Sequence, residues 1–248
     1  MGRYLILVYG IFSYLIGLGG LVFFILFIGG WEFMPVHIDS GTPGPLGIAL
    51  LINVGLVLLF GLQHSVMARS GFKKTWTKLI PKAAERSTYV LLSGIILCLI
   101  GLYWQTLPGT LWQIDNSIAR TIIIACQLVG WVLLVLASFV INHFELFGLQ
   151  QVYFNFVNKP EPAPNFTDRF IYKLVRHPIQ LGVLVGIWLT PTMTMTHLML
   201  SSMMSSYIFI GLYYEEKDLI ATLGQEYKDY MERVSKLLPI PKKATTAE

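Results

Sequence analysis

Charged residues are scarce in this sequence. Only 13% of the 248 residues are Asp, Glu, Lys or Arg, whereas 54% are hydrophobic and the mean hydropathy is +0.62. Soluble domains usually contain about 25% charged residues, so the composition excludes an ordinary soluble domain. We therefore predict an all-α, polytopic integral membrane protein. The sequence pI near 9.0 then indicates attraction to anionic lipid head groups rather than to nucleic acid.

Cysteine is scarcer still, and the two cysteines, Cys98 and Cys126, both lie inside apolar runs. They are expected to pack as small apolar residues, and neither a disulfide nor a metal site is predicted. Internal repeats and low-complexity tracts are also absent. We therefore expect residues 1–248 to form a single transmembrane domain.

The longest uncharged stretch is Ile179–Tyr214, which contains no Asp, Glu, Lys or Arg over 36 residues. A straight helix of that length would extend roughly 54 Å, whereas the hydrocarbon core of a membrane is about 30 Å thick. Pro191 lies in the small polar run Thr190–Thr196, and an interior proline breaks a helix. Residues 174–216 are therefore predicted to form a helical hairpin of two spans.

Four further apolar segments are each long enough to cross a membrane, because a spanning helix needs about 20 residues. They are Tyr4–Ile28, Leu46–Val66, Ser87–Leu107 and Ala119–Ile141. Six spans in total place both termini on one side. The first apolar run is too long for the core of a signal peptide, so we expect it to be retained.

The segment after the hairpin, residues 217–238, is predicted to form an amphipathic helix at the membrane surface. Its apolar residues recur every three or four positions between polar ones. Gly224 interrupts this pattern, and Pro239 and Pro241 follow its end. The helix is either a simple surface anchor or a lid over a site at the mouth of the hairpin.

Basic residues predict the orientation. Under this span assignment, 17 of the 18 Lys and Arg residues fall on the side of the N-terminus, and only Arg120 lies opposite. Because basic loops stay on the cytoplasmic side during insertion, both termini are expected to be cytoplasmic.

Polar residues collect where four of the six predicted spans meet the cytoplasmic boundary. Such groups are costly there unless they face a cavity or one another. Taken alone, each has an ordinary interpretation, such as an arginine that reaches the head groups or a proline at a helix start. Together, a basic group and an acidic pair beside one apolar hairpin could bind a small zwitterionic cofactor. These groups are Gln63, His64, Asn142, His143, Glu145, Arg176, His177, Glu215 and Glu216.

Two segments carry a family resemblance. The first is an ordered set made of Tyr172, Arg176-His177-Pro178, Gly182, Glu215-Glu216, Leu219, Gly224, Tyr227, Tyr230 and Pro239. It resembles the isoprenylcysteine carboxyl methyltransferase superfamily over about residues 170 to 241. Residues 142–151 read NHFELFGLQQ and resemble a narrower branch, the membrane-bound methanethiol S-methyltransferases, which have nurim-like relatives. Gln180 departs from the superfamily pattern, in which many members carry an aromatic residue after the proline.

The resemblance implies that S-adenosyl-L-methionine binds in residues 142–248, at the cytoplasmic mouth of the hairpin. Arg176 or His177 would lie near the methionyl carboxylate, and the two glutamates would meet the amino group or the ribose hydroxyls. Tyr227 would close over the adenosyl moiety. The full set expected to bind the cofactor is Tyr172, Leu174, Arg176, His177, Pro178, Gln180, Gly182, Glu215, Glu216 and Tyr227.

Methyl transfer to a thiol calls for a base, because the thiolate is the nucleophile and an unperturbed thiol has a pKa of about 8.5. His143 is the first candidate for a catalytic base, and His64 is the second. The acceptor is expected to meet four further residues, which are Asn142, Glu145, Gln150 and Gln63.

The narrower resemblance implies an S-adenosylmethionine-dependent enzyme of a bacterial inner membrane that methylates methanethiol to dimethyl sulfide. A prenylated cysteine or a phospholipid amine is an alternative acceptor. An NADPH-dependent membrane reductase and a non-enzymatic transport or structural protein also remain open. The sequence does not decide the oligomeric state or whether hydrogen sulfide is also methylated.

Overall fold

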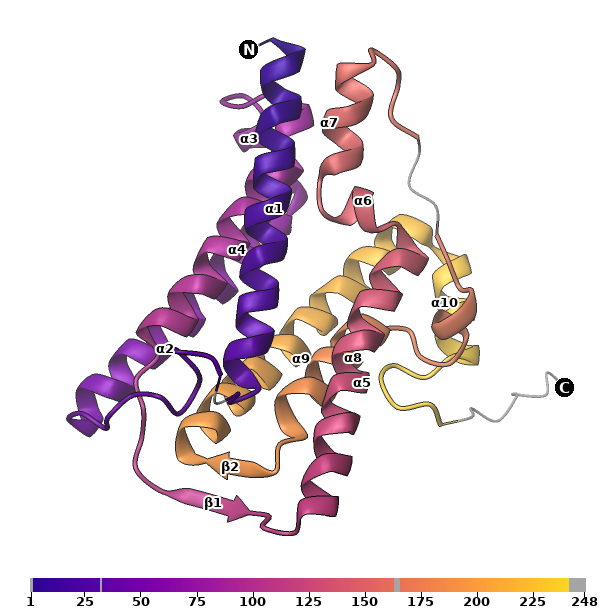
Figure 1. Cartoon of the computed structure of the whole chain (residues 1–248). Helices are drawn as coiled ribbons and strands as arrows, with labels where there is room; N and C mark the ends of the chain where they lie inside the picture. The colour runs from indigo at the N-terminus through magenta and orange to yellow at the C-terminus, as the bar shows by residue number, and fades with distance from the viewer. Residues whose placement is uncertain (1, 32, 163–165, 241–248) are drawn as a thin grey trace, which may run out of the picture. The chain divides into compact units, whose positions relative to one another are not determined.

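The structure, a computed structural model, describes residues 2–31, 33–162 and 166–240. Helices dominate it, and Figure 1 shows their course. In chain order the elements are α1 (Arg3–Ile28), α2 (Leu46–Ala68), α3 (Ser70–Trp76), η1 (Lys82–Ala84), α4 (Glu85–Tyr103), β1 (Thr110–Gln113), α5 (Ser117–Ile141), α6 (His143–Leu146), α7 (Leu149–Phe156), η2 (Phe170–Lys173), α8 (Pro178–Trp188), β2 (Thr192–Thr194), α9 (Met195–Leu223) and α10 (Gln225–Arg233). Residues 241–248, which include Pro241, Lys242 and Lys243 and belong to the predicted catalytic segment, lie outside the described residues.

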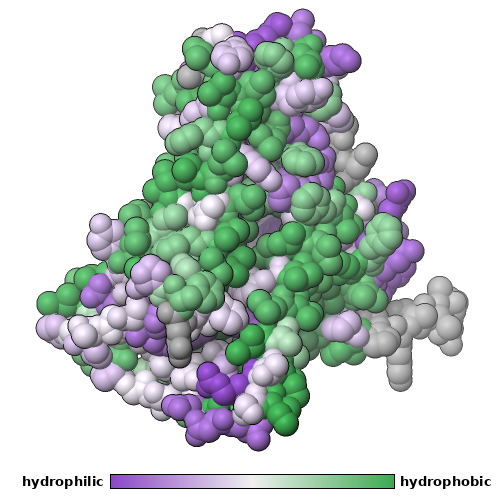
Figure 2. Space-filling model, in the orientation of Figure 1, coloured by the Kyte–Doolittle hydropathy of each residue, from purple (hydrophilic) through white to green (hydrophobic). Residues whose placement is uncertain are grey.

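Among the described residues, five helical segments are long and apolar enough to cross a membrane, and they confirm the prediction of a helical, multi-pass membrane protein. They are α1, α2, Lys82–Tyr103, α5 and α9. Large apolar side chains on these helices are exposed, for example Leu51 at 73% and Ile118 at 70%. Figure 2 shows hydrophobic residues over much of the visible face. Such exposure is unfavourable in water but suits contact with lipid chains.

The hairpin differs in detail from the prediction. Its first helix, α8, has only 11 residues and extends about 16 Å, which is short of a full crossing. The bend does contain Pro191, but it also contains strand β2, which pairs antiparallel with β1. The second helix, α9, continues for 29 residues to Leu223, so both glutamates lie within a helix. The count of six spans stays a prediction.

The tail helix is shorter than expected, because residues 217–223 continue α9. Gly224 has a φ of +62°, a left-handed conformation that glycine adopts most readily, and α10 begins directly after it. Gly224 therefore separates the two helices, in agreement with the interruption seen in the sequence pattern. The location of α10 at a membrane surface stays a prediction.

The described residues form two compact units. The first comprises residues up to Ile114, the stretch from Asn142 to Pro162, and Pro191–Met203. The second comprises Asp115–Ile141, the described residues from Phe166 to Thr190, and those from Met204 onward. The expectation of a single domain over residues 1–248 stays a prediction.

Close helix contact through glycine organises the second unit. A Cβ atom built on Gly182 of α8 would lie 2.5 Å from the carbonyl oxygen of Gly130 in α5, so the two backbones touch. One turn further along α8, the Gln127 amide of α5 donates a hydrogen bond of 2.9 Å to the carbonyl oxygen of Gly186. Gly182 therefore serves helix packing, and these contacts hold α8 against α5.

Candidate functional site

A buried ion pair joins the start of α8 to α9 in the second unit. The Nε and Nη2 atoms of Arg176 donate to Oε1 of Glu216 at 2.9 and 2.6 Å. The two side chains are only 5% and 8% exposed. The remaining nitrogen, Nη1, donates to the carbonyl oxygens of Met231 and Val234 at the end of α10. Every guanidinium nitrogen therefore has a protein acceptor, which offsets the cost of burying the charge.

Glu216 has two further partners. His177 Nε2 lies 3.1 Å from Oε1, and Lys236 Nζ lies 2.6 Å from Oε2. The backbone strengthens this arrangement, since Arg176 N donates to Ser235 O at 2.9 Å and His177 N donates to Lys236 O at 3.2 Å. The segment after α10 is thus bound alongside the residues that precede α8. We call this set of contacts the Arg176 clasp.

Three tyrosines pack beside the Arg176 clasp. The Tyr230 hydroxyl donates to the carbonyl oxygen of Tyr172 at 2.6 Å, and the Tyr172 hydroxyl donates to the carbonyl oxygen of Ala137 in α5 at 3.4 Å. The Tyr227 hydroxyl is buried and has no hydrogen-bond partner among the described residues. Burial, with the charge of Glu216, raises the pKa of Tyr227 to about 12, while Arg176 acts in the opposite direction. Tyr227 therefore keeps its proton at neutral pH and can donate it to a ligand.

Glu215 is placed quite differently from its neighbour. Its side chain is 47% exposed, and Gln180 Nε2 donates to its Oε2 at 3.2 Å. His177 Nδ1 lies 3.9 Å from the same oxygen. Of the residues expected to bind the cofactor, the structure brings most together, whereas Leu174 is 62% exposed and Gly182 faces α5.

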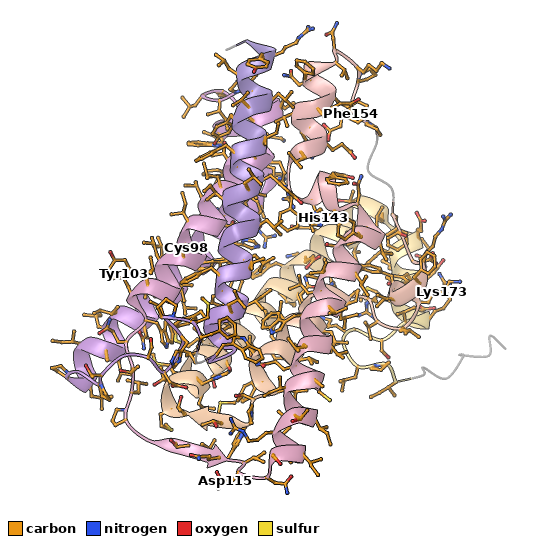
Figure 3. The ribbon with its side chains drawn as sticks, viewed as in Figure 1. Cys98, Tyr103, Asp115, His143, Phe154 and Lys173 are labelled. Atoms are coloured by element: carbon orange, nitrogen blue, oxygen red, sulfur yellow. The ribbon has the colours of Figure 1, made fainter. Side chains whose placement is uncertain are left out.

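His143 belongs to the first unit, where it begins α6 (Figure 3). The residue is 5% exposed, and its Nε2 lies 3.0 Å from the Tyr14 hydroxyl of α1. The ring of Phe147 stacks on it at a centroid distance of 4.6 Å. Burial lowers the pKa of His143, so the imidazole is neutral at neutral pH. A neutral, held imidazole is the form that can accept a proton.

His64, also in the first unit, has both ring nitrogens engaged. Its Nε2 lies 2.7 Å from the Tyr89 hydroxyl, and its Nδ1 lies 3.2 Å from Ser93 Oγ. Gln63 shares this network, because its Oε1 accepts from Ser93 Oγ at 3.1 Å. These bonds join α2 to α4, so His64 and Gln63 have packing partners that account for their presence.

The remaining expected acceptor residues form a network of their own around α6. Asn142 donates through Nδ2 to Gln150 Oε1 at 2.7 Å and to Glu145 Oε2 at 3.1 Å. Its Oδ1 accepts from the backbone nitrogen of Glu145 at 3.2 Å, which caps the helix. Gly148 follows in a left-handed conformation, and a Cβ atom there would lie 2.8 Å from Ser87 N. This tight turn explains why the motif reads Phe-Gly-Leu at that point.

Sequence reasoning missed two partners that complete these clusters, Lys236 beside Glu216 and Tyr14 beside His143. Lys236 is one of several basic residues in the tail, and Tyr14 is one aromatic residue in an apolar span. No local pattern distinguishes either residue, and only the fold reveals its role. Among the described residues, no three His, Cys, Asp or Glu side chains gather as a metal site.

Comparisons with known proteins bear on these clusters. Residues 52–214 match the family described as NnrU protein. The chain is 42% identical to a methanethiol S-methyltransferase of Mycobacterium tuberculosis, over 99% of this chain and 100% of that protein. It is 43% identical to one of Crocosphaera subtropica, over 96% and 93% of the two chains. Mouse nurim is 30% identical over 69% of this chain and 68% of its own.

No solved structure matches the chain. The family match covers more than half of the sequence, and the methyltransferase matches extend over almost all of it. This protein therefore belongs to the NnrU family, alongside the methanethiol S-methyltransferases.

Proposed function

We propose that this protein transfers a methyl group from S-adenosyl-L-methionine to methanethiol and releases dimethyl sulfide. The observation that carries the proposal is the similarity to a methanethiol S-methyltransferase over 99% of the chain. A match of that length includes both the Arg176 clasp and the His143 cluster, rather than a shared membrane segment alone.

The second unit fits a donor that carries an ammonium group and a nucleoside. Glu215 keeps an exposed carboxylate that can accept hydrogen bonds from an ammonium group, and the buried Tyr227 hydroxyl has no hydrogen-bond partner in the part of the chain that the structure describes. Arg176 and Glu216, in contrast, already satisfy each other. We therefore propose that Glu215, His177, Gln180 and Tyr227 contact the donor, whereas Arg176 and Glu216 hold the tail in place. The donor supplies an electrophilic methyl group on a sulfonium.

The first unit supplies the proton acceptor. We propose that His143 takes the thiol proton, because its imidazole is neutral and its ring is held by Tyr14 and Phe147. The thiolate sulfur then forms a bond to the methyl carbon while the sulfonium bond to that carbon breaks. His64 is the weaker candidate, since both of its ring nitrogens already have partners. Asn142, Glu145 and Gln150 would shape the acceptor site through their mutual hydrogen bonds.

A membrane location suits this chemistry, because methanethiol and dimethyl sulfide are small and apolar and enter lipid readily. We place both termini in the cytoplasm of a bacterium and the protein in its inner membrane. The distribution of Lys and Arg supports this orientation.

The proposal is tested with membranes that contain the protein and S-adenosylmethionine labelled in its methyl group. Methanethiol, a farnesylated cysteine analogue and phosphatidylethanolamine are offered separately, and labelled dimethyl sulfide is measured in the headspace. Dimethyl sulfide should form only with methanethiol, and it should form roughly a hundredfold more slowly in membranes that carry a His143→Ala variant. Label transferred to the cysteine analogue or the lipid instead would contradict the proposed acceptor. Hydride transfer from labelled NADPH, with no methyl transfer, would replace the reaction class altogether.

A further inference from the structure

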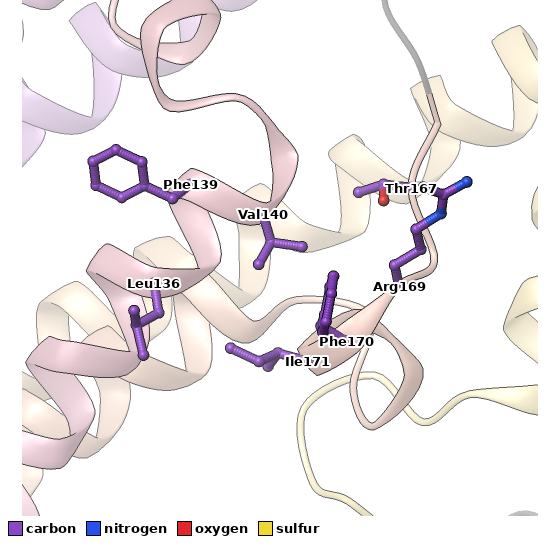
Figure 4. A pocket seen from close by; sticks show the side chains of 7 residues that line it. All are labelled: Leu136, Phe139, Val140, Thr167, Arg169, Phe170 and Ile171. Carbon is purple, nitrogen blue, oxygen red and sulfur yellow. The ribbon is translucent and has the colours of Figure 1, made fainter.

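A pocket of about 570 Å³ lies in the second unit between the C-terminal end of α5 and the segment that enters η2. Figure 4 shows the lining side chains of α5 on one side and those of Thr167, Arg169, Phe170 and Ile171 on the other. Five of the lining residues are apolar, and two are polar. They are Leu136, Phe139, Val140, Phe170 and Ile171, with Thr167 and Arg169.

The walls of the pocket are held by contacts outside it. The Tyr172 hydroxyl bonds to the backbone of α5 at Ala137, and Tyr230 bonds to the backbone of Tyr172. Phe170 has a φ of +50°, a left-handed conformation that a bulky residue adopts only where its surroundings hold it. The Phe170 ring nevertheless remains 76% exposed. An aromatic ring held outward at the end of an apolar span is suited to contact with lipid.

The charge at the pocket is positive. Arg169 is exposed, and its guanidinium has no partner among the described residues. Lys173, labelled in Figure 3, is also exposed one turn further along the chain. The acid beside Arg169, Asp168, already pairs with Arg233 at 3.7 Å. An apolar pocket beside an exposed guanidinium at the boundary of a membrane span combines the two features that an anionic lipid recognises.

We propose that this pocket binds one anionic phospholipid, with an acyl chain against Val140 and Ile171 and the phosphate at Arg169. A soluble phosphate ester would leave the apolar walls without a partner, and a zwitterionic head group would bring a second positive charge to Arg169. The site is separate from the Arg176 clasp, and the proposal does not depend on the methyl acceptor.

Native mass spectrometry of the purified full chain in mild detergent tests this proposal. The probes are phosphatidylglycerol, phosphatidylcholine with the same acyl chains, and glycerol 1-phosphate. We expect one phosphatidylglycerol to be retained in preference to phosphatidylcholine, and no retention of glycerol 1-phosphate. Arg169→Gln should weaken that retention by roughly fivefold, as expected for the loss of one basic residue near an anionic head group. Val140→Trp should weaken it by filling the pocket.

Two matched variants serve as controls. Lys228→Gln removes an exposed positive charge from α10, and Val132→Trp adds a tryptophan at an exposed position of α5 away from the pocket. Both should retain phosphatidylglycerol as the unmodified chain does, and all variants are checked for folding by thermal unfolding. Equal retention of the two lipids, unchanged retention by a folded Arg169→Gln protein, or binding of glycerol 1-phosphate alone would each overturn the proposal.

Discussion

The two polar clusters of this protein pair their buried polar groups in different ways. In the second unit, the Arg176 clasp is ionic, and its charges are matched by carboxylate, ammonium and carbonyl groups. In the first unit, His143 and His64 are bonded to hydroxyl groups, and the His143 imidazole is neutral. A saturated ionic cluster resists change, because the loss of one partner leaves a buried charge. A neutral imidazole can gain a proton with less disturbance. The ionic cluster of the second unit therefore suits positioning, and the histidines of the first unit suit proton transfer.

The largest expected effect comes from breaking the ionic cluster. Arg176→Ala leaves Glu216 buried without its main partner and releases the carbonyl oxygens of Met231 and Val234. We expect a loss of about 3–5 kcal/mol in the free energy of unfolding. Denaturant unfolding of the purified protein in detergent measures it. Arg233→Ala, which removes an exposed ion pair with Asp168, should change stability by less than about 1 kcal/mol. Equal losses in the two variants would refute the structural role of Arg176.

The second-largest effect is expected when a histidine of the first unit is replaced. His143→Ala should reduce the rate of dimethyl sulfide formation by roughly a hundredfold or more, because a positioned base contributes that much to proton transfer. His64→Ala should cost mainly stability, since its bonds join α2 to α4. Headspace assays on folded protein distinguish the two. If His64→Ala lost more of the rate than His143→Ala, His64 would be the base and His143 the structural residue.

The two adjacent glutamates offer a finer comparison. Glu215→Gln should weaken the binding of S-adenosylmethionine about tenfold, because one charge-assisted hydrogen bond is worth roughly 1.5 kcal/mol, and it should leave the fold intact. Titration calorimetry measures the affinity. Glu226→Gln, at an exposed position of α10, is the matched control and should bind as the unmodified chain does. Unchanged binding by the Glu215 variant would remove it from the donor site.

The smallest effect lies in the pH dependence. The pKa of His143 is lowered by burial from its ordinary value of 6.5, so the neutral base persists to lower pH. Activity should therefore fall only on the acid side of pH 6.5, as pH drops through the lowered pKa. Because the unfolded chain binds this proton more readily, the contribution of His143 to stability is lost in the same direction. Tyr14→Phe should move the acid midpoint by less than about one pH unit and cost about 1 kcal/mol in stability. A midpoint above pH 6.5 would speak against His143.

Several features could be read from the sequence because they are local. The apolar runs predicted α1, α2 and α5 with ends within two residues, and Pro191 marked the bend of the hairpin. The pairing of the segment at Arg176 with the segment at Glu216 also followed, since the uncharged stretch between them had to fold back. The pairing of β2 with β1 could not be predicted, because the two strands lie far apart in the sequence, and the short length of α8 was not predicted either.

The sequence by itself determined that this chain is an integral membrane protein and that acidic and basic residues flank its last apolar hairpin. Only the tertiary structure decided which of those residues neutralise one another and which remain available to a ligand. Glu215 and Glu216 are identical in type and adjacent in sequence, yet the rotation of about 100° between successive helical residues turns one toward Arg176 and leaves the other exposed. The choice between them depends on residues 40 positions away, and no local pattern records it.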